Sequence, residues 1–334
     1  MPLRVMLWGL ACALAVPAKA SLLELAMPDA RFLAGANLES VRGSKLAQAL
    51  WAQLQARERE VGELARRTGF DPLRDLSEVL IASPGGSKPS VLLVARGAFD
   101  RTDLAAVVRS KMTGREIYQG VEILLAEEKR GEPMALAFLD ATLLVAGDPA
   151  SVRGAIARRG RGALAGGELR REAQQWMARY DAWGVSVVPF EELASRARDE
   201  QAASMLAGDV VKAVEQVAGG VRLRDALELD LRTVSRSEQD AVNLANALRF
   251  FSGMLQAREP AAASYLRELS VEGRTMRLAM AVPEDELLRI AGMLGLRART
   301  TTTKPAAPPD TGVTIYSSPG DMGIVRIPAP GKPQ

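Results

Sequence analysis

The mature chain that this sequence predicts contains neither cysteine nor histidine. Cys12 is the only cysteine, and none of the 334 residues is a histidine. Residues 1–20 have the pattern of a secretory signal peptide: Arg4 lies in a short basic region, a mostly apolar run follows, and small residues precede a cleavage site after Ala20. Cleavage leaves 314 residues without a thiol or an imidazole. The hydrophobic core therefore has to stabilise this chain without disulfides.

The signal peptide predicts export to the bacterial periplasm or to the medium. Its apolar run, from Val5 to Val16, is shorter than the ~20 residues needed to cross a bilayer. The later apolar run Met134–Gly147 is interrupted by Asp140, so we expect no transmembrane segment after cleavage. A lipid anchor on Cys12 is the alternative, although Gly9 stands where a lipoprotein signal has a branched apolar residue.

The composition is that of a globular protein, with 48% hydrophobic and 25% charged residues. The formal net charge is +3, and it falls to +1 when Arg4 and Lys19 leave without any acidic residue. A nearly neutral chain has no overall electrostatic attraction to nucleic acid, so we expect no nucleic-acid partner.

Apolar periodicity divides the chain into two stretches that each predict strands and helices. In residues 21–160, leucines at helical spacing indicate a helix over 41–68, and Gly/Pro-rich turns separate strand-like runs. A second stretch, 168–296, has clean alternation of leucines and charged residues over Arg222–Val234, which predicts one half-buried antiparallel strand. The other expected strands are 30–38, 76–82, 90–95, 116–119, 121–126, 134–139, 142–146, 184–188, 269–272 and 274–282. The other expected helices are 100–112, one from Asp148, 191–218 (broken near Gly208), 237–257 and 283–293.

Both stretches end in the same way, with a strand, then an acid and a proline, then a helix. The first ends at Asp148-Pro149 and the second at Pro283-Glu284. We therefore expect an α+β fold of two related modules, 21–160 and 168–296, each a mainly antiparallel sheet with helices packed on it. Residues 297–334 form a Thr/Pro-rich tail that is too poor in apolar residues to order itself, with a short hairpin expected near its end.

The usual catalytic constellations do not occur in the predicted mature chain. Without histidine or cysteine, Ser-His-Asp and Cys-His sites are impossible, and Gly85-Gly86-Ser87-Lys88 lacks the spacing of a phosphate loop and predicts a hairpin turn. Carboxylates remain, at Asp71 and Asp75 and at Asp225, Glu228 and Asp230. Arg224 and Arg232 flank the last two and favour ordinary ion pairs, and aromatic residues that stack on sugars make up only 4% of the chain. We predict no catalytic, cofactor-binding or metal-binding residue.

Two clusters are candidates for interaction with a ligand or partner. The chain's one basic concentration includes Arg158, Arg159 and Arg161, which indicates either a contact with a polyanion or a solvated linker. Trp176, Tyr180 and Trp183 follow at spacings of four and three, which predicts one aromatic helix face. We expect that face to pack the two modules together, with stacking on a ligand as the alternative.

Several short motifs resemble those of uncharacterised secreted proteins of soil-type bacteria. They are Gly69-Phe70-Asp71-Pro72-Leu73-Arg74-Asp75-Leu76, Gly97-Ala98-Phe99-Asp100, Tyr118-Gln119-Gly120-Val121 and Ala146-Gly147-Asp148. The resemblance implies no activity, because these motifs mark turns and element ends. The sequence therefore favours an exported, non-enzymatic binding or assembly protein of the bacterial cell envelope, which has an envelope protein or ligand as its partner. A carboxylate-dependent hydrolase and a carrier of a hydrophobic ligand are the alternatives.

Overall fold

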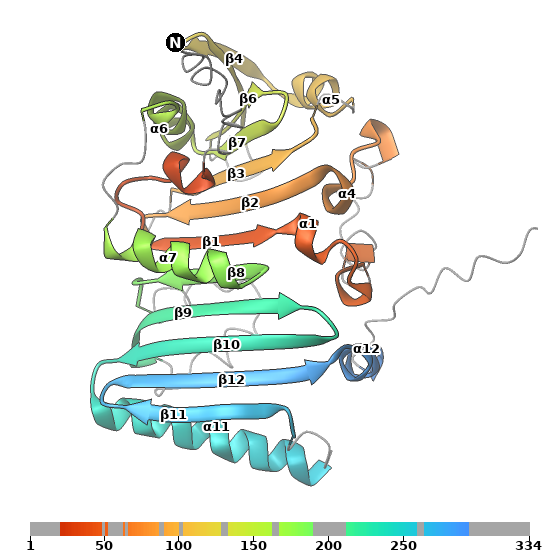
Figure 1. Ribbon diagram of the computed structural model, residues 1–334. Helices are drawn as coiled ribbons and strands as arrows, with labels where there is room; N and C mark the ends of the chain where they lie inside the picture. Colours follow the sequence, from red (N-terminus) through yellow and green to blue (C-terminus); the bar gives the residue numbers. More distant parts are fainter. Residues whose placement is uncertain are drawn as a thin grey trace, which may run out of the picture. The chain divides into compact units, whose positions relative to one another are not determined.

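In the described part of the chain, twelve strands form a single antiparallel sheet (Figure 1). The structure, a computed structural model, describes residues 21–48, 51–52, 63, 66–86, 90–99, 103–127, 133–161, 167–189, 212–258 and 264–293. They all belong to one unit, Met1–Ala298. The predicted signal peptide, most of the predicted helix over 41–68, residues 190–211 and the predicted tail lie outside the described residues.

The strands follow the predicted runs closely in the first half of the chain. They are β1 (Phe32–Asn37), β2 (Leu76–Ser83), β3 (Leu92–Gly97), β4 (Gly114–Tyr118), β5 (Val121–Glu127), β6 (Pro133–Asp140), β7 (Leu143–Gly147), β8 (Ala182–Ser186), β9 (Val214–Leu223), β10 (Ala226–Ser235), β11 (Leu266–Glu272) and β12 (Thr275–Pro283). The helices are η1 (Leu22–Leu25), α1 (Leu38–Val41), α4 (Pro72–Asp75), α5 (Leu104–Lys111), α6 (Pro149–Arg158), α7 (Glu168–Arg179), α11 (Glu238–Arg258) and α12 (Glu284–Met293). This mixture of helices with a large antiparallel sheet confirms the α+β class.

The strand order places the two halves of the chain side by side in the same sheet. It runs β11-β12-β10-β9-β8-β1-β2-β3-β7-β6-β5-β4, and every pairing is antiparallel. The halves meet where β1 pairs with β8, from Phe32 opposite Ser186 to Ala36 opposite Ala182. The ladder of hydrogen bonds is therefore continuous across the predicted boundary between the modules.

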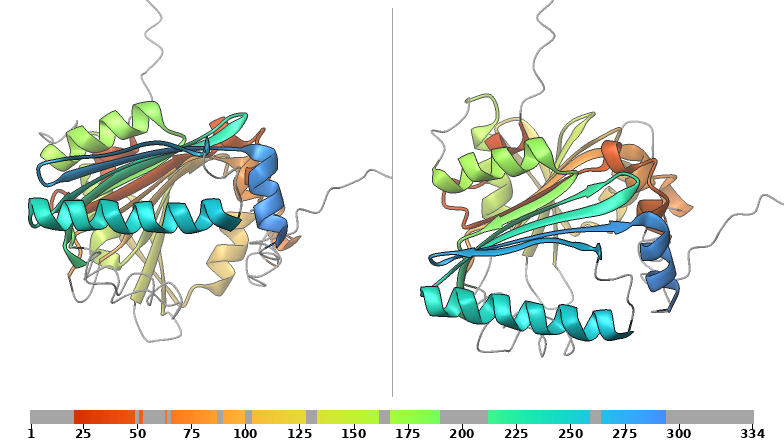
Figure 2. Two further views of the ribbon diagram at one scale, coloured as in Figure 1. Left: turned by 90° about the horizontal axis from the view of Figure 1, so that it is seen from below. Right: turned by 60° about the horizontal axis from the view of Figure 1, so that its bottom comes forward.

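Helices cover both faces of this sheet. Figure 2 shows α7 and α11 on opposite faces. On the α7 face, side chains of η1, α6 and α7 pack with Leu33, Leu80, Val94 and Val145 in the largest apolar cluster. On the other face, α5 packs through Leu104 in a second cluster around stacked aromatic rings. These two clusters supply the burial that a fold without disulfides needs.

The first described residues belong to the core. Leu22, Leu23 and Leu25 of η1 are buried, and the Ser21 hydroxyl accepts a hydrogen bond from the Leu23 N–H at 3.3 Å. The Arg158 guanidinium donates to the Leu25 carbonyl oxygen from Nε at 3.2 Å and from Nη2 at 2.8 Å. Burial lowers the pKa of Arg158, and the nearby Arg170 guanidinium lowers it further.

Two predictions for the second half were wrong. The expected strand Arg222–Val234 is a hairpin, because the chain turns at Arg224 and Asp225 and Leu223 pairs with Leu227. The expected helix 191–218 is also wrong at its end, where β9 begins at Val214. The alternation of leucines and charged residues continues on both sides of this tight turn. The alternation therefore did not show that the chain reverses its direction there. The ladders of β9 with β8 and β10 override the helical preference of the segment's alanines.

Candidate functional site

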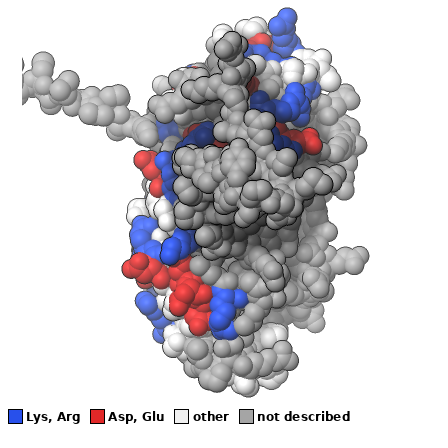
Figure 3. Space-filling model, turned by 90° about the vertical axis from the view of Figure 1, so that its right-hand side faces the viewer, with Lys and Arg blue, Asp and Glu red and all other residues white. Residues whose placement is uncertain are grey.

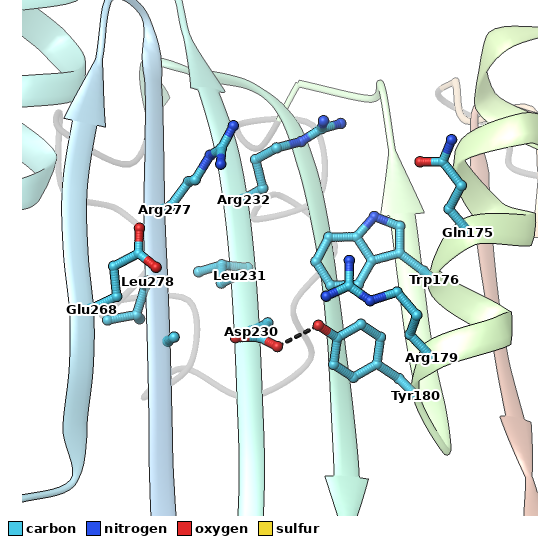
Figure 4. Close-up of a pocket in the computed structure, with 11 residues that line it drawn as sticks. Gln175, Trp176, Arg179, Tyr180, Asp230, Leu231, Arg232, Glu268, Arg277 and Leu278 are labelled. Atoms are coloured by element: carbon cyan, nitrogen blue, oxygen red, sulfur yellow. Dashed lines mark hydrogen bonds between the residues drawn. The ribbon is translucent and has the colours of Figure 1, made fainter.

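A groove of about 280 Å³ opens beside the C-terminal end of α7, where the helix faces β10, β12 and β11 (Figure 4). Helix and strand residues line it from opposite sides. From α7 and the residue after it come Gln175, Trp176, Arg179 and Tyr180. From the strands come Asp230, Leu231, Arg232, Glu268, Arg277, Leu278 and Ala279.

The aromatic wall of the groove is fixed by the end of α7. Tyr180 ends the helix, since its backbone N–H donates to the Trp176 carbonyl while its own backbone is extended. The two rings stack with centroids 4.9 Å apart and an interplanar angle of 28°. The Trp176 indole N–H also donates to Glu172 at 3.4 Å, so a ring contact and a hydrogen bond both position the partly buried indole.

The Tyr180 ring crosses the sheet directly over a glycine. A Cβ built on Gly220 of β9 would lie 2.3 Å from Cγ of Tyr180, so only glycine leaves room for the ring. Gly220 pairs with Asp230 of β10, and this register brings the Tyr180 hydroxyl within hydrogen-bonding range of the Asp230 carboxylate, to which it donates (Figure 4). Burial and this hydrogen bond raise the pKa of Tyr180 to about 12.

Two guanidinium groups lie over the same ring. Arg222 is 5.4 Å and Arg179 5.6 Å from the Tyr180 ring centroid, within the range of cation–π contacts. Arg222 also forms an ion pair with Glu228 at 2.7 Å and donates to the Arg179 carbonyl at 2.8 Å. Arg179 has no carboxylate partner among the described residues.

The floor of the groove carries two arginines on neighbouring strands. Arg232 of β10 and Arg277 of β12 are directly opposite one another in the register. Arg232 pairs with Glu172 of α7, whereas the exposed Arg277 has no hydrogen-bond or ion-pair partner within the described part of the chain. The groove therefore combines a fixed aromatic surface with three guanidinium groups, of which Arg179 and Arg277 have no carboxylate partner among the described residues.

Trp183 does not belong to the predicted aromatic helix face. The helix ends before it, and Trp183 lies on β8 with 7% of its surface exposed. It is opposite Gly35 of β1, where a Cβ would lie 2.9 Å from the indole Cζ2 atom. Trp176 and Tyr180 therefore line the groove, whereas Trp183 does not line it and is buried in the same apolar cluster as Tyr180, where the two halves of the sheet meet.

The arginine cluster is largely occupied by contacts within the chain. Arg158 binds the Leu25 carbonyl, as described above, and Arg159 donates to the Leu139 carbonyl at 2.5 Å and pairs with Asp140 at 2.7 Å. The exposed Arg161 makes no side-chain hydrogen bond or ion pair with any described residue. Two of the three candidates therefore have intramolecular partners.

Most of the carboxylates that the sequence suggested as candidates also have partners within the chain. Asp71 caps α4 by accepting from the Leu73 N–H at 3.0 Å, and Asp75 accepts from the Asp71 N–H at 2.8 Å and pairs with Arg74. Glu228 and Asp230 lie on the groove face of β10, as alternation predicts, with Arg222 and Tyr180 as their partners. In the portion of the chain that is described, no group of three or more acidic side chains is placed to hold a metal ion.

Sequence reasoning missed Arg179, Glu268 and Arg277 as groove residues. Their positions depend on the pairing of β10 with β12 and on where α7 ends. The alternation of β12 places Arg277 on one face, but its neighbour on that face is known only from the register. Nothing local distinguishes these side chains from ordinary exposed charges.

Charges of both signs are interspersed elsewhere on the described surface. Figure 3 shows acidic and basic side chains of the described residues lying next to one another on the side of the molecule that it displays. Ion pairs such as Arg153 with Glu116 at 2.7 Å are of this kind. None of the helices that the structure describes is long and apolar enough to span a membrane.

Comparisons with solved structures give a likeness of the fold. No protein family matches the chain, and no curated protein matches it. One matching solved structure is described as "Structure of crystal form I of TP0453". It is 9% identical, with 83% of this chain and 98% of that chain covered and a TM-score of 0.47.

Proposed function

We propose that this protein is an exported, non-enzymatic binding protein of the bacterial cell envelope, located in the periplasm or outside the cell. The groove beside α7 is its binding site. The sequence supports export through its signal-peptide pattern.

One observation carries the assignment of the site. The groove is lined both by the partly buried Trp176 indole and by Arg277, whose charge has no partner among the described residues. A fixed ring and an unpaired guanidinium in one groove offer stacking and charge-assisted hydrogen bonds to a ligand. Concave sites with a few convergent polar groups are the usual ligand-binding sites of proteins.

Binding accounts for the groove better than hydrolysis does. A carboxylate-dependent hydrolase needs one carboxyl that holds a proton at neutral pH and a second that is ionised. Near the groove, Asp230 accepts from Tyr180 and Glu228 pairs with Arg222, so contacts within the chain already occupy both carboxylates. A carrier of a hydrophobic ligand needs an enclosed apolar cavity, whereas this groove is open and lined by charged groups.

Photo-crosslinking in intact cells tests the proposed function. The photoreactive amino acid p-benzoylphenylalanine replaces Gln175 at the groove, and in a control it replaces the exposed Arg171 of the same helix, which does not line the groove. We expect an adduct, seen as a mass increase of the purified protein, from position 175 only, and its loss on Trp176→Ala. Equal adducts at both positions, or none at position 175, would contradict the proposal.

We also propose that the two halves arose by internal duplication. The order in which strands pair supports this: β1-β2-β3 is followed in space by β7 and β6, and β8-β9-β10 is followed by β12 and β11. In each half a helix, α5 or α11, follows the third strand. A twofold axis between Ala34 and Gly184, at the centre of the β1–β8 ladder, would relate the halves. An experimental structure tests this, because β1–β3 and β8–β10 should superpose after a rotation near 180°.

A further inference from the structure

The opposed pair Arg232 and Arg277 is unfavourable for stability. Like charges directly opposite on neighbouring strands repel each other, and these two lie on the same face of the sheet. Glu172 neutralises Arg232 from α7, but Arg277 has no such partner in the described chain. Local arrangements that oppose stability concentrate at functional sites, and this pair lines the groove.

The Trp176 indole supplies an independent indication of what the groove binds. Its ring is positioned by stacking on Tyr180 and by the hydrogen bond to Glu172, so little side-chain freedom is lost on binding. Gln175 and Glu268 line the same groove and offer a neutral amide and an acceptor. An indole face bordered by hydrogen-bonding groups suits a sugar ring, whose C–H groups stack on the indole while its hydroxyls bind the polar rim.

We infer that the groove binds an anionic sugar, with its carboxylate or phosphate group on Arg277 and Arg232 and its ring on Trp176. This inference rests on the proposed function and names the class of its ligand. Guanidinium groups bind both anions through paired N–H donors, which makes them suited to this role. A volume of about 280 Å³ suits one small ligand unit rather than a large cofactor. An acidic peptide offers carboxylates but no sugar ring to stack on the Trp176 indole.

Isothermal titration of the mature protein with defined sugars tests this inference. The probes are glucuronate, glucose 1-phosphate, and uncharged glucose, each at low and at physiological salt. We expect binding of at least one anionic sugar, weaker binding at higher salt, and no measurable binding of glucose. Binding of glucuronate would identify a carboxylate ligand. Binding of glucose 1-phosphate would identify a phosphate ligand. Glucose binding as tight as that of the anions, or binding of none of the three, would overturn the inference.

Variants separate the anion contact from the ring contact. Arg277→Gln should weaken binding of the anionic sugar about tenfold or more, whereas the control Arg171→Gln should leave it unchanged. Trp176→Ala should abolish binding of the sugar. If inorganic phosphate or acetate binds as tightly as the sugar and Trp176→Ala has no effect, the groove binds anions only and the sugar assignment is wrong.

Thermal unfolding of Arg277→Gln distinguishes a role of Arg277 in binding from a role in stabilising the fold. Since Arg277→Gln removes the repulsion with Arg232, its melting temperature should equal or exceed that of the wild type. A lowered melting temperature together with weaker binding would show that Arg277 supports the fold, which contradicts the inference. An adduct at position 175 without sugar binding leaves the proposed function intact and removes only the sugar assignment.

Discussion

The aromatic ring of Tyr180 rests on the backbone of Gly220, and this contact fixes the wall of the groove. The two residues come from the end of α7 and from β9, and any side chain at 220 would occupy the position of the ring. The contact orients the Tyr180 hydroxyl toward Asp230, and the Tyr180 ring stacks on the indole of Trp176. The geometry of the site therefore depends on a residue without a side chain.

Gly220→Ala should destabilise the protein by about 1–3 kcal/mol, because the added methyl group forces the Tyr180 ring away from the sheet. Gly184→Ala is a matched control on β8, since a Cβ there would lie at an ordinary 3.7 Å from Ala34. Urea unfolding of both variants measures the difference. Equal midpoints for the two variants would mean that the ring does not pack on Gly220.

Tyr180 should make the stability of the protein depend on alkaline pH. Its pKa is raised from 10.0 to about 12, so the folded state holds the phenolic proton more tightly than the unfolded state does. This stabilisation is complete below pH 10 and is lost as the pH rises from 10 to about 12. Tyr180→Phe should cost about 1 kcal/mol at pH 7, where the hydrogen bond to Asp230 is lost.

Tyr180→Phe should lose less stability than the wild type as the pH is raised above 10. Urea unfolding at several pH values measures this, and the absorbance of tyrosinate follows the titration directly. If wild type and Tyr180→Phe lose stability in parallel over this pH range, burial of Tyr180 does not perturb its titration.

Trp183 and Trp176 should differ in their contributions to stability. Trp183→Ala should cost about 3–5 kcal/mol, since the indole is buried where β1 meets β8. Trp176→Ala should cost less, about 1–2 kcal/mol, because its ring is only partly buried at the groove. Denaturant midpoints measure both values. A larger loss for Trp176 would place it in the core rather than at a binding surface.

Arg158 should stabilise the fold, whereas Arg161 should not. Arg158→Met removes both donors to the Leu25 carbonyl and should cost about 1–3 kcal/mol. Arg161→Met changes an exposed side chain and should alter the free energy of unfolding by less than about 0.5 kcal/mol. Equal effects of the two substitutions in urea unfolding would contradict the role of Arg158 in holding η1.

The mature protein should begin at Ser21. Leu22, Leu23 and Leu25 are buried directly after the predicted cleavage site, so we expect cleavage to precede the docking of η1. The intact mass of the secreted protein measures its first residue. A lipid attached to Cys12 would contradict both the cleavage site and a soluble location.

The sequence by itself determined most of the individual elements, because local interactions decide where they begin and end. Asp148 and Pro149 mark the start of α6, where the Asp148 carboxylate accepts from the Ser151 N–H at 2.9 Å. The turn at Gly120 separates β4 from β5 in the same way, with positive φ at Gln119 and Gly120. Such signals are contained within a few neighbouring residues.

Only the tertiary structure decided how these elements form the groove. The reversal at Arg224 and Asp225 sets the register of β10, and that register places Arg232 opposite Arg277. It also brings Asp230 to Tyr180, which lies 50 residues earlier in the chain. Pairing between distant strands depends on the packing of the whole sheet, and a shift of one residue would turn these side chains to the other face. The periodicity of each segment alone therefore predicted most of the strands, but not the start of β9 at Val214 or which charged side chains lie together at the site.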